Sequence, residues 1–224
     1  PGDALLLIIS DHGFTSFRRG VNINAWLHAN GYLHLKPGAA PSTEWLEAID
    51  WSSTRAYALG LAGLFINMQG RESQGIVRPG AEATDLVEEL RAGLTSLVDS
   101  KQDGDDGVGV HPIRRVIYVE QDMTGPYRHD GPDLIICYEH GYRCSWECAR
   151  GAVTDAVLCD NTRPWTGDHC VDPDLVPGIL LANHPLQTQC PSIVDIAPTV
   201  ADALGVDPDP RMQGRSLLKA RMPT

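Results

Sequence analysis

A continuous apolar run, Ala4 to Ile9, constrains the fold of this chain more than any other part of the sequence. An uninterrupted apolar run of this length is typical of a parallel strand that is buried on both faces of a sheet. The run leads directly into Ser10-Asp11-His12-Gly13. Ligands of open α/β sheets bind at the carboxyl ends of the strands. We therefore predict an α/β fold in which Asp11 and His12 lie at a functional edge of the sheet.

Strands that alternate with helical patterns support the α/β prediction. We expect further strands at Ile113–Val119, Leu134–Tyr138 and Gly178–Ala182, and a hairpin or a bulged strand in the glycine-broken stretch Ala56–Asn67. Three helices are expected: one capped by Asn22, one capped by Thr84, and one from near Asp195 to before Gly205. In the last of these helices, the spacing places Val200 and Leu204 on the buried side.

The charge balance limits the classes of ligand. The net charge of −11 argues against a broad nucleic-acid surface, because such surfaces hold phosphates with clustered lysines and arginines. An acidic protein can still bind phosphate esters when metal ions supply the positive charge. No apolar run approaches the roughly 20 residues that a membrane-spanning helix needs.

Six cysteines lie in the second half of the chain: Cys137, Cys144, Cys148, Cys159, Cys170 and Cys190. A chain of this size does not need disulfides to stabilise its core, so we expect mostly reduced, structural thiols. A zinc or disulfide role stays open, because Cys144 and Cys148 are four residues apart and form half of a possible metal site on a helix.

Four residues are candidates for a functional site. Asp11 and His12 place a carboxylate beside an imidazole, two groups that bind zinc or manganese, although the dipeptide is also common outside metal sites. His169 follows a glycine turn and is a candidate metal ligand or general acid/base, with a surface histidine as the alternative. Arg143 follows a predicted strand and is a candidate phosphate contact, with a solvated arginine as the alternative.

Three segments in this order resemble the alkaline phosphatase superfamily, and within it the type I phosphodiesterase and nucleotide pyrophosphatase branch. Members of that branch have a strand ending in Ser-Asp-His-Gly, a later Gly-x-His segment, and a near-terminal Asp-Ile-Ala-Pro-Thr helix followed by Met-x-Gly-x-Ser-Leu. The corresponding segments here are Ser10–Gly13, Gly167–His169, Asp195–Thr199 and Met212–Leu217.

The resemblance implies a three-layer α/β sandwich with a mostly parallel sheet and metal-dependent hydrolysis of phosphodiester or pyrophosphate bonds. The substrate would be a phosphate-ester small molecule or a nucleotide. Asp11 and His12 would bind one divalent ion, and His169 a second. Zinc is the expected metal, with manganese as an alternative. The nucleophile of the family is a threonine or serine that forms a covalent phospho-enzyme.

One departure from the family pattern concerns the nucleophile. The family places it, with further metal ligands, before Ser-Asp-His-Gly, and the ten residues before Asp11 cannot hold them. We therefore expect residues 1–224 to be the C-terminal part of one alkaline-phosphatase-like domain, incomplete at its N-terminus, with residues about 36–160 including loop or insert elements. No catalytic nucleophile is assigned within the chain, and the chain alone is expected to be inactive.

Two alternatives remain open. Sulfatases and phosphoethanolamine transferases also use Ser-Asp-His-Gly, and a non-catalytic binding module could keep the fold without the chemistry. If the missing half supplies strands to the same sheet, this chain exposes an apolar face or a sheet edge and associates with itself.

Overall fold

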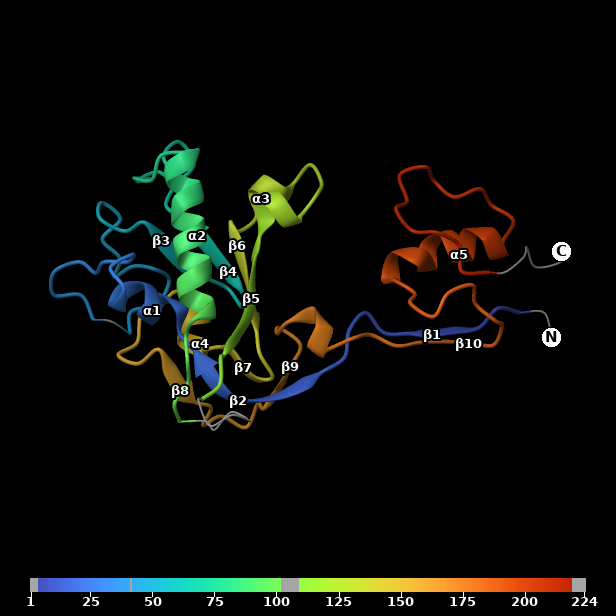
Figure 1. Ribbon diagram of the computed structural model, residues 1–224, viewed down its shortest axis with the longest axis horizontal. Coiled ribbons are helices and arrows are strands. Elements are labelled where there is room, and N and C mark those ends of the chain that lie inside the picture. The colour runs from blue at the N-terminus through green and yellow to red at the C-terminus, as the bar shows by residue number, and fades with distance from the viewer. Residues whose placement is uncertain (1–3, 41, 102–108, 219–224) are drawn as a thin grey trace. The chain divides into compact units, whose positions relative to one another are not determined.

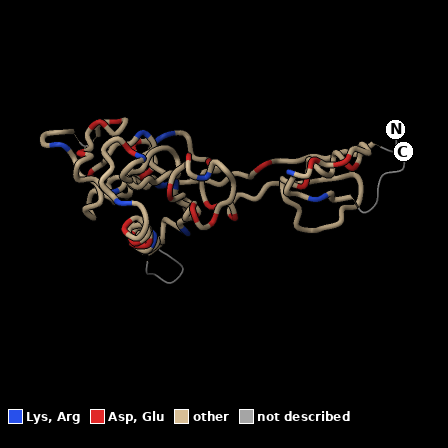
Figure 2. Tube along the Cα trace, turned by 90° about the horizontal axis from the view of Figure 1, so that it is seen from above, with Lys and Arg blue, Asp and Glu red and all other residues tan. Residues whose placement is uncertain are grey.

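The computed structural model describes residues 4–40, 42–101 and 109–218 (Figure 1). The chain divides into two compact units, one formed by residues 14–176 and a smaller one formed by residues 1–13 with 177–224. Each unit is described by itself. Acidic and basic residues both occur in each of the two units (Figure 2).

The larger unit contains two four-stranded sheets. The first has the strand order β3-β4-β6-β5 and is antiparallel throughout. Its strands are β3 (Ala56–Leu59), β4 (Gly63–Ile66), β5 (Ile113–Tyr118) and β6 (Leu134–Tyr138). The second has the order β7-β2-β8, with β9 also paired to β2. Its strands are β2 (Thr15–Val21), β7 (Gly141–Cys144), β8 (Leu158–Asp160) and β9 (Gly167–Asp168).

The larger unit also contains helices, and several of them share one hydrophobic core with the strands. The helices are α1 (Ile23–Ala29), α2 (Ala81–Thr95), α3 (Val119–Asp122) and α4 (Trp146–Ala149), with short 3₁₀ turns at Arg128–Asp130 and Pro173–Leu175. Figure 1 shows α2 running along the first sheet. Leu86, Leu90 and Leu94 of α2 are fully buried, as the helical spacing of these leucines requires.

The predicted local signals hold in this unit, with one exception. Asn22 caps α1, and its side-chain oxygen accepts a hydrogen bond from the amide of Ala25 at 2.8 Å. The hairpin prediction is confirmed by β3 and β4, which Gly60 joins with a φ of 77°. The predicted cap at Thr84 is wrong: the amide of Thr84 already donates to the Gly80 carbonyl, and the helix begins one turn earlier.

The prediction of a mostly parallel sheet is also wrong. Among the paired strands of the described residues, only β2 with β7 is parallel. The apolar run from Ala4 forms β1 (Leu7–Ile9), which pairs antiparallel with β10 (Leu180–Ala182) in a two-stranded ribbon of the smaller unit. Its side chains are only partly covered, and Leu6 and Ile8 are 57% and 52% exposed.

The smaller unit ends in the predicted helix, which is α5 (Ile196–Ala203), preceded by a 3₁₀ turn at Ile193–Asp195. The carboxylate of Asp195 accepts hydrogen bonds from the amides of Ser192 and Arg215, which tie the start of the helix to the returning chain. The expected buried side is wrong, since Val200 and Leu204 are exposed. Thr199 is buried instead, because its hydroxyl accepts a hydrogen bond from the amide of Leu217 in the returning chain.

Candidate metal centre

Asp11 and His12 follow β1 directly and lie close together in the smaller unit. The Nδ1 atom of His12 is 2.9 Å from the Gly13 carbonyl oxygen. Because a carbonyl oxygen only accepts, Nδ1 donates this bond. Nε2 lies 3.6 Å from Oδ2 of Asp11. Two ligands of one tetrahedral zinc ion are about 3.3 Å apart, so the donor atoms of this pair fit one ion.

The backbone around these two residues is fixed by the neighbouring segment of the same unit. The amide of Ser10 donates to the Ile179 carbonyl, and the amide of Ile179 donates to the Ser10 hydroxyl, each at 3.0 Å. Gly178 lies so close to the backbone of Ser10 that a Cβ atom at position 178 would be 2.5 Å from the Ser10 carbonyl oxygen. A pocket of about 320 Å³ opens beside Asp11. The tip of β1 is thus both held in place and accessible.

His169 lies in the larger unit, directly after β9. That strand pairs with the first two residues of β2. The ring of Phe14 contacts the His169 ring edge-to-face at 5.4 Å. Asp168, His169 and Cys170 each offer a donor atom, and these atoms lie within 4.8 Å of one another. A carboxylate, an imidazole and a thiol are all zinc ligands, so this group is a possible metal site.

Both carboxylate oxygens of Asp168 have partners. One of its oxygens accepts hydrogen bonds from the amides of His169 at 2.7 Å and Cys170 at 3.0 Å. Its other oxygen lies 2.9 Å from Nη1 of Arg143. Burial alone would raise the pKa of Asp168, but the Cys170 amide, the Arg143 charge and the His169 amide together hold the pKa below its usual value. Asp168 is therefore a carboxylate in the folded protein.

The predicted site residues thus fall into two sets. Asp11 and His12 lie together in the smaller unit, and His169 lies in the larger one with Asp168 and Cys170, which sequence reasoning had not assigned. Their position beside His169 was the only available signal. Arg143 is 2% exposed and bound to Asp168, so it is not the solvated arginine of the sequence-based alternative, and its contact with phosphate stays a prediction.

All six cysteines are free thiols. Cys144 ends β7 and Cys148 lies in α4, and both are buried. Within the described parts of the chain, residues 168–170 are the one group of three potential metal-binding side chains, so no third ligand completes a site at Cys144 and Cys148.

Burial, followed by the charge of Asp168, raises the pKa of Cys170 to about 11.

Comparison with known proteins assigns the chain to a family. Residues 2–148 match type I phosphodiesterase / nucleotide pyrophosphatase, a range that includes Ser10–Gly13 and ends before His169. No curated protein and no solved structure matches the chain. None of the helices in the described residues is long and apolar enough to cross a membrane. Because the match covers most of the 224 residues, the chain belongs to the type I phosphodiesterase / nucleotide pyrophosphatase family.

Proposed function

We propose that the protein to which this chain belongs hydrolyses phosphodiester or pyrophosphate bonds with the help of two divalent metal ions. Family membership supports the reaction type. The arrangement of Asp11 and His12 supports metal dependence, because an imidazole nitrogen and a carboxylate oxygen, both of them zinc-binding groups, lie 3.6 Å apart. This pair, within the matched range, is the observation that carries the proposal.

Asp11 and His12 would hold one ion, and His169 would contribute to holding the other. A bound divalent ion would supply positive charge to the oxygens of a phosphoryl group. Zinc is the preferred metal because imidazole and thiol donors accompany the carboxylates, whereas manganese favours sites built mainly from oxygen donors. A phosphate-ester small molecule or a nucleotide is the corresponding class of substrate.

The nucleophile is assigned to sequence outside these 224 residues, and the chain to the C-terminal part of one alkaline-phosphatase-like domain. The exposed ribbon supports this assignment. Its apolar side chains Ile8 and Leu181, which face each other across the two strands, are both more than half exposed. Apolar residues arranged in this way are typical of a sheet to which further strands belong.

The first test is a zinc titration of the chain by isothermal calorimetry, with Asp11→Asn, His12→Ala and His169→Ala as variants. His140→Ala is the matched control, because His140 is an exposed histidine outside both candidate groups. We expect each of the three variants to lose zinc affinity and the control to keep it. Equal zinc binding by all four variants would remove the metal assignment.

The second test measures turnover by a longer protein that includes the preceding sequence. We expect hydrolysis of a nitrophenyl phosphodiester that His12→Ala abolishes, and no turnover by residues 1–224 alone. Preferential turnover of a nitrophenyl sulfate would instead place the protein with the sulfatases. The absence of any metal-dependent turnover would favour a binding module.

A further inference from the structure

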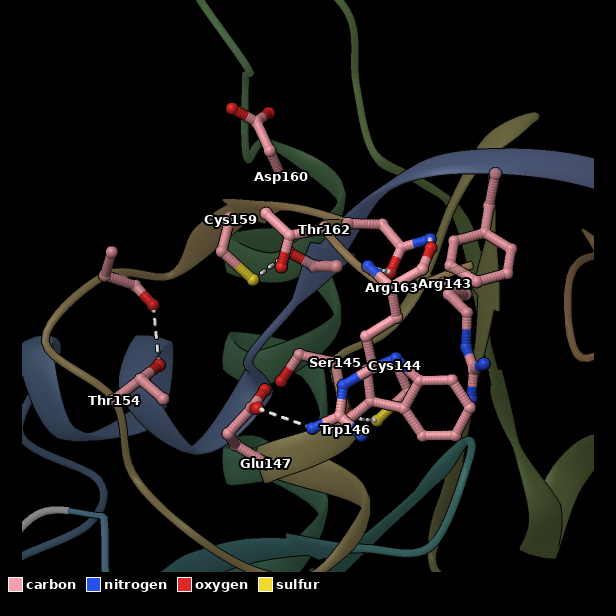
Figure 3. A pocket seen from close by; sticks show the side chains of 14 residues that line it. Arg143, Cys144, Ser145, Trp146, Glu147, Thr154, Cys159, Asp160, Thr162 and Arg163 are labelled. Carbon is pink, nitrogen blue, oxygen red and sulfur yellow. Dashed lines mark hydrogen bonds and ion pairs between the residues drawn. The ribbon is translucent and has the colours of Figure 1, made fainter. Parts of the chain in front are cut away.

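Arg143 is a buried cation held between aromatic rings. It lies on β7, and its guanidinium carbon is 5.0 Å from the centre of the Phe17 ring and 4.3 Å from the centre of the Trp146 ring. Guanidinium groups stack on aromatic faces in this way, which fixes the plane of the group. Figure 3 shows the Trp146 ring between Arg143 and a second arginine, Arg163, at the edge of a pocket of about 350 Å³.

Among the residues that the structure describes, the carboxylate paired with Arg143 is that of Asp168, at 2.9 Å. Asp168 in turn accepts the backbone amides of His169 and Cys170. Both members of the ion pair are buried, with Arg143 2% and Asp168 7% exposed. A chain of contacts therefore runs from the two aromatic rings through Arg143 and Asp168 to the backbone that carries the His169 ring.

We propose that Arg143 is a positioning residue, which fixes the place and direction of the His169 side chain through Asp168. This inference rests on the proposed function insofar as His169 binds metal. The partners that orient a metal ligand through hydrogen bonds influence metal affinity nearly as much as the ligands themselves. A buried ion pair contributes little net stability, because desolvation offsets its attraction, and positioning explains why one is present here.

Arg163 provides a matched control. Its guanidinium carbon lies 5.2 Å from the centre of the same Trp146 ring, but its ion-pair partner is Glu147 at 3.8 Å, not Asp168. Changing Arg163 removes a stacked cation from Trp146 without touching the contacts of Asp168. Arg143→Gln therefore removes the contact with Asp168 that the inference concerns, and Arg163→Gln leaves it in place.

The test compares amide hydrogen exchange and zinc affinity in the full chain carrying Arg143→Gln or Arg163→Gln. In Arg143→Gln, we expect the amides of His169 and Cys170 to exchange on the order of tenfold faster, because hydrogen bonds to a positioned carboxylate are lost. The amide of Leu90 in the core should exchange as in the unmodified chain. Zinc affinity should fall by about 10- to 100-fold. Arg163→Gln should leave all of these values unchanged.

Unchanged exchange of the His169 and Cys170 amides in Arg143→Gln would overturn the inference. So would equal acceleration in Arg163→Gln. If Arg143→Gln does not fold, Arg143→Lys and Arg163→Lys replace the pair, since lysine keeps the charge but lacks the planar group that stacks on the rings. Faster exchange at the two amides in Arg143→Lys alone would then support the inference, and equal rates in the two lysine variants would overturn it.

The two proposals fail separately. If His169→Ala leaves zinc affinity unchanged, the metal role of His169 is wrong, and the exchange rates still decide whether Arg143 holds the segment. If His169→Ala lowers zinc affinity but Arg143→Gln leaves both exchange and affinity unchanged, the metal role stands and the positioning role of Arg143 is wrong.

Discussion

Replacing Gly178 by alanine should disturb the tip of β1 without altering any side chain of the candidate site. The added Cβ atom would lie 2.5 Å from the Ser10 carbonyl oxygen and 3.2 Å from that of Asp11. Ordinary contact begins at 3.4 Å, so the Ser10 carbonyl has to move away by about 0.9 Å. That movement is opposed by the two hydrogen bonds between Ser10 and Ile179.

The magnitude follows from this conflict. Overpacking against fixed backbone costs about 1–3 kcal/mol. The clash lowers the free energy that is needed to open the ribbon locally by the same amount. The amides of Ser10 and Ile179 should therefore exchange about 5- to 150-fold faster. Since Asp11 follows Ser10, we also expect weaker zinc binding by Asp11 and His12, because a displacement approaching 1 Å misplaces a ligand.

Amide hydrogen exchange by NMR measures the first effect, and calorimetric zinc titration measures the second. Gly131→Ala is the control, because its Cβ would meet nothing closer than 3.9 Å. The reasoning is refuted if Gly178→Ala leaves the exchange of Ser10 and Ile179 at the rates of the unmodified chain. It is also refuted if Gly131→Ala accelerates the exchange of these two amides equally.

Three further predictions test the fold. Asn24→Leu leaves both backbone groups of Ala58 without their buried side-chain partners, so unfolding of the larger unit in urea, followed by tryptophan fluorescence, should show a loss of about 2–4 kcal/mol. Burial, together with the Glu72 charge, raises the pKa of Tyr57 to about 12. Loss of the Tyr57 proton therefore destabilises the folded state relative to the unfolded state. Stability should therefore fall as the pH rises from about 10 to 12, and Tyr57→Phe should reduce that fall in pH-dependent urea titrations. Ile8→Lys should reduce self-association of the chain in sedimentation experiments, and a monomeric unmodified chain would contradict the view that its exposed ribbon belongs to a larger sheet.

Local signals in the sequence predicted local structure well. The side chain of Asn22 caps α1 because it reaches the amide three residues later, and both residues lie in the same short window of sequence. The hairpin at Ala56–Ile66 follows equally from a single glycine that adopts a positive φ. Even the misplaced start of α2 is an error of one turn. These features depend on contacts within a few residues, which a sequence displays directly.

Strand orientation could not be predicted in the same way. The run from Ala4 is as apolar as a buried parallel strand, but its partner β10 lies more than 170 residues away and runs antiparallel. β2 was missed altogether, because Arg18 and Arg19 interrupt its apolar pattern. Arg19 is nevertheless buried, since Asp99 neutralises it at 2.6 Å. The orientation of a strand and the burial of a charged side chain both depend on pairing between distant residues, which no local sequence pattern indicates.

The same limit applies to the candidate site. Asp11, His12 and His169 were proposed from short stretches of sequence, whereas the bond between Arg143 and Asp168 joins residues 25 positions apart. That bond also links two parts of the chain that the family match separates, because Arg143 lies within the matched residues 2–148 and Asp168 outside them. Pairing of β9 with Thr15–Ser16 makes a second link of this kind. The His169 segment is thus packed against matched residues of its own unit, which gives a structural reason to treat it as part of the family fold.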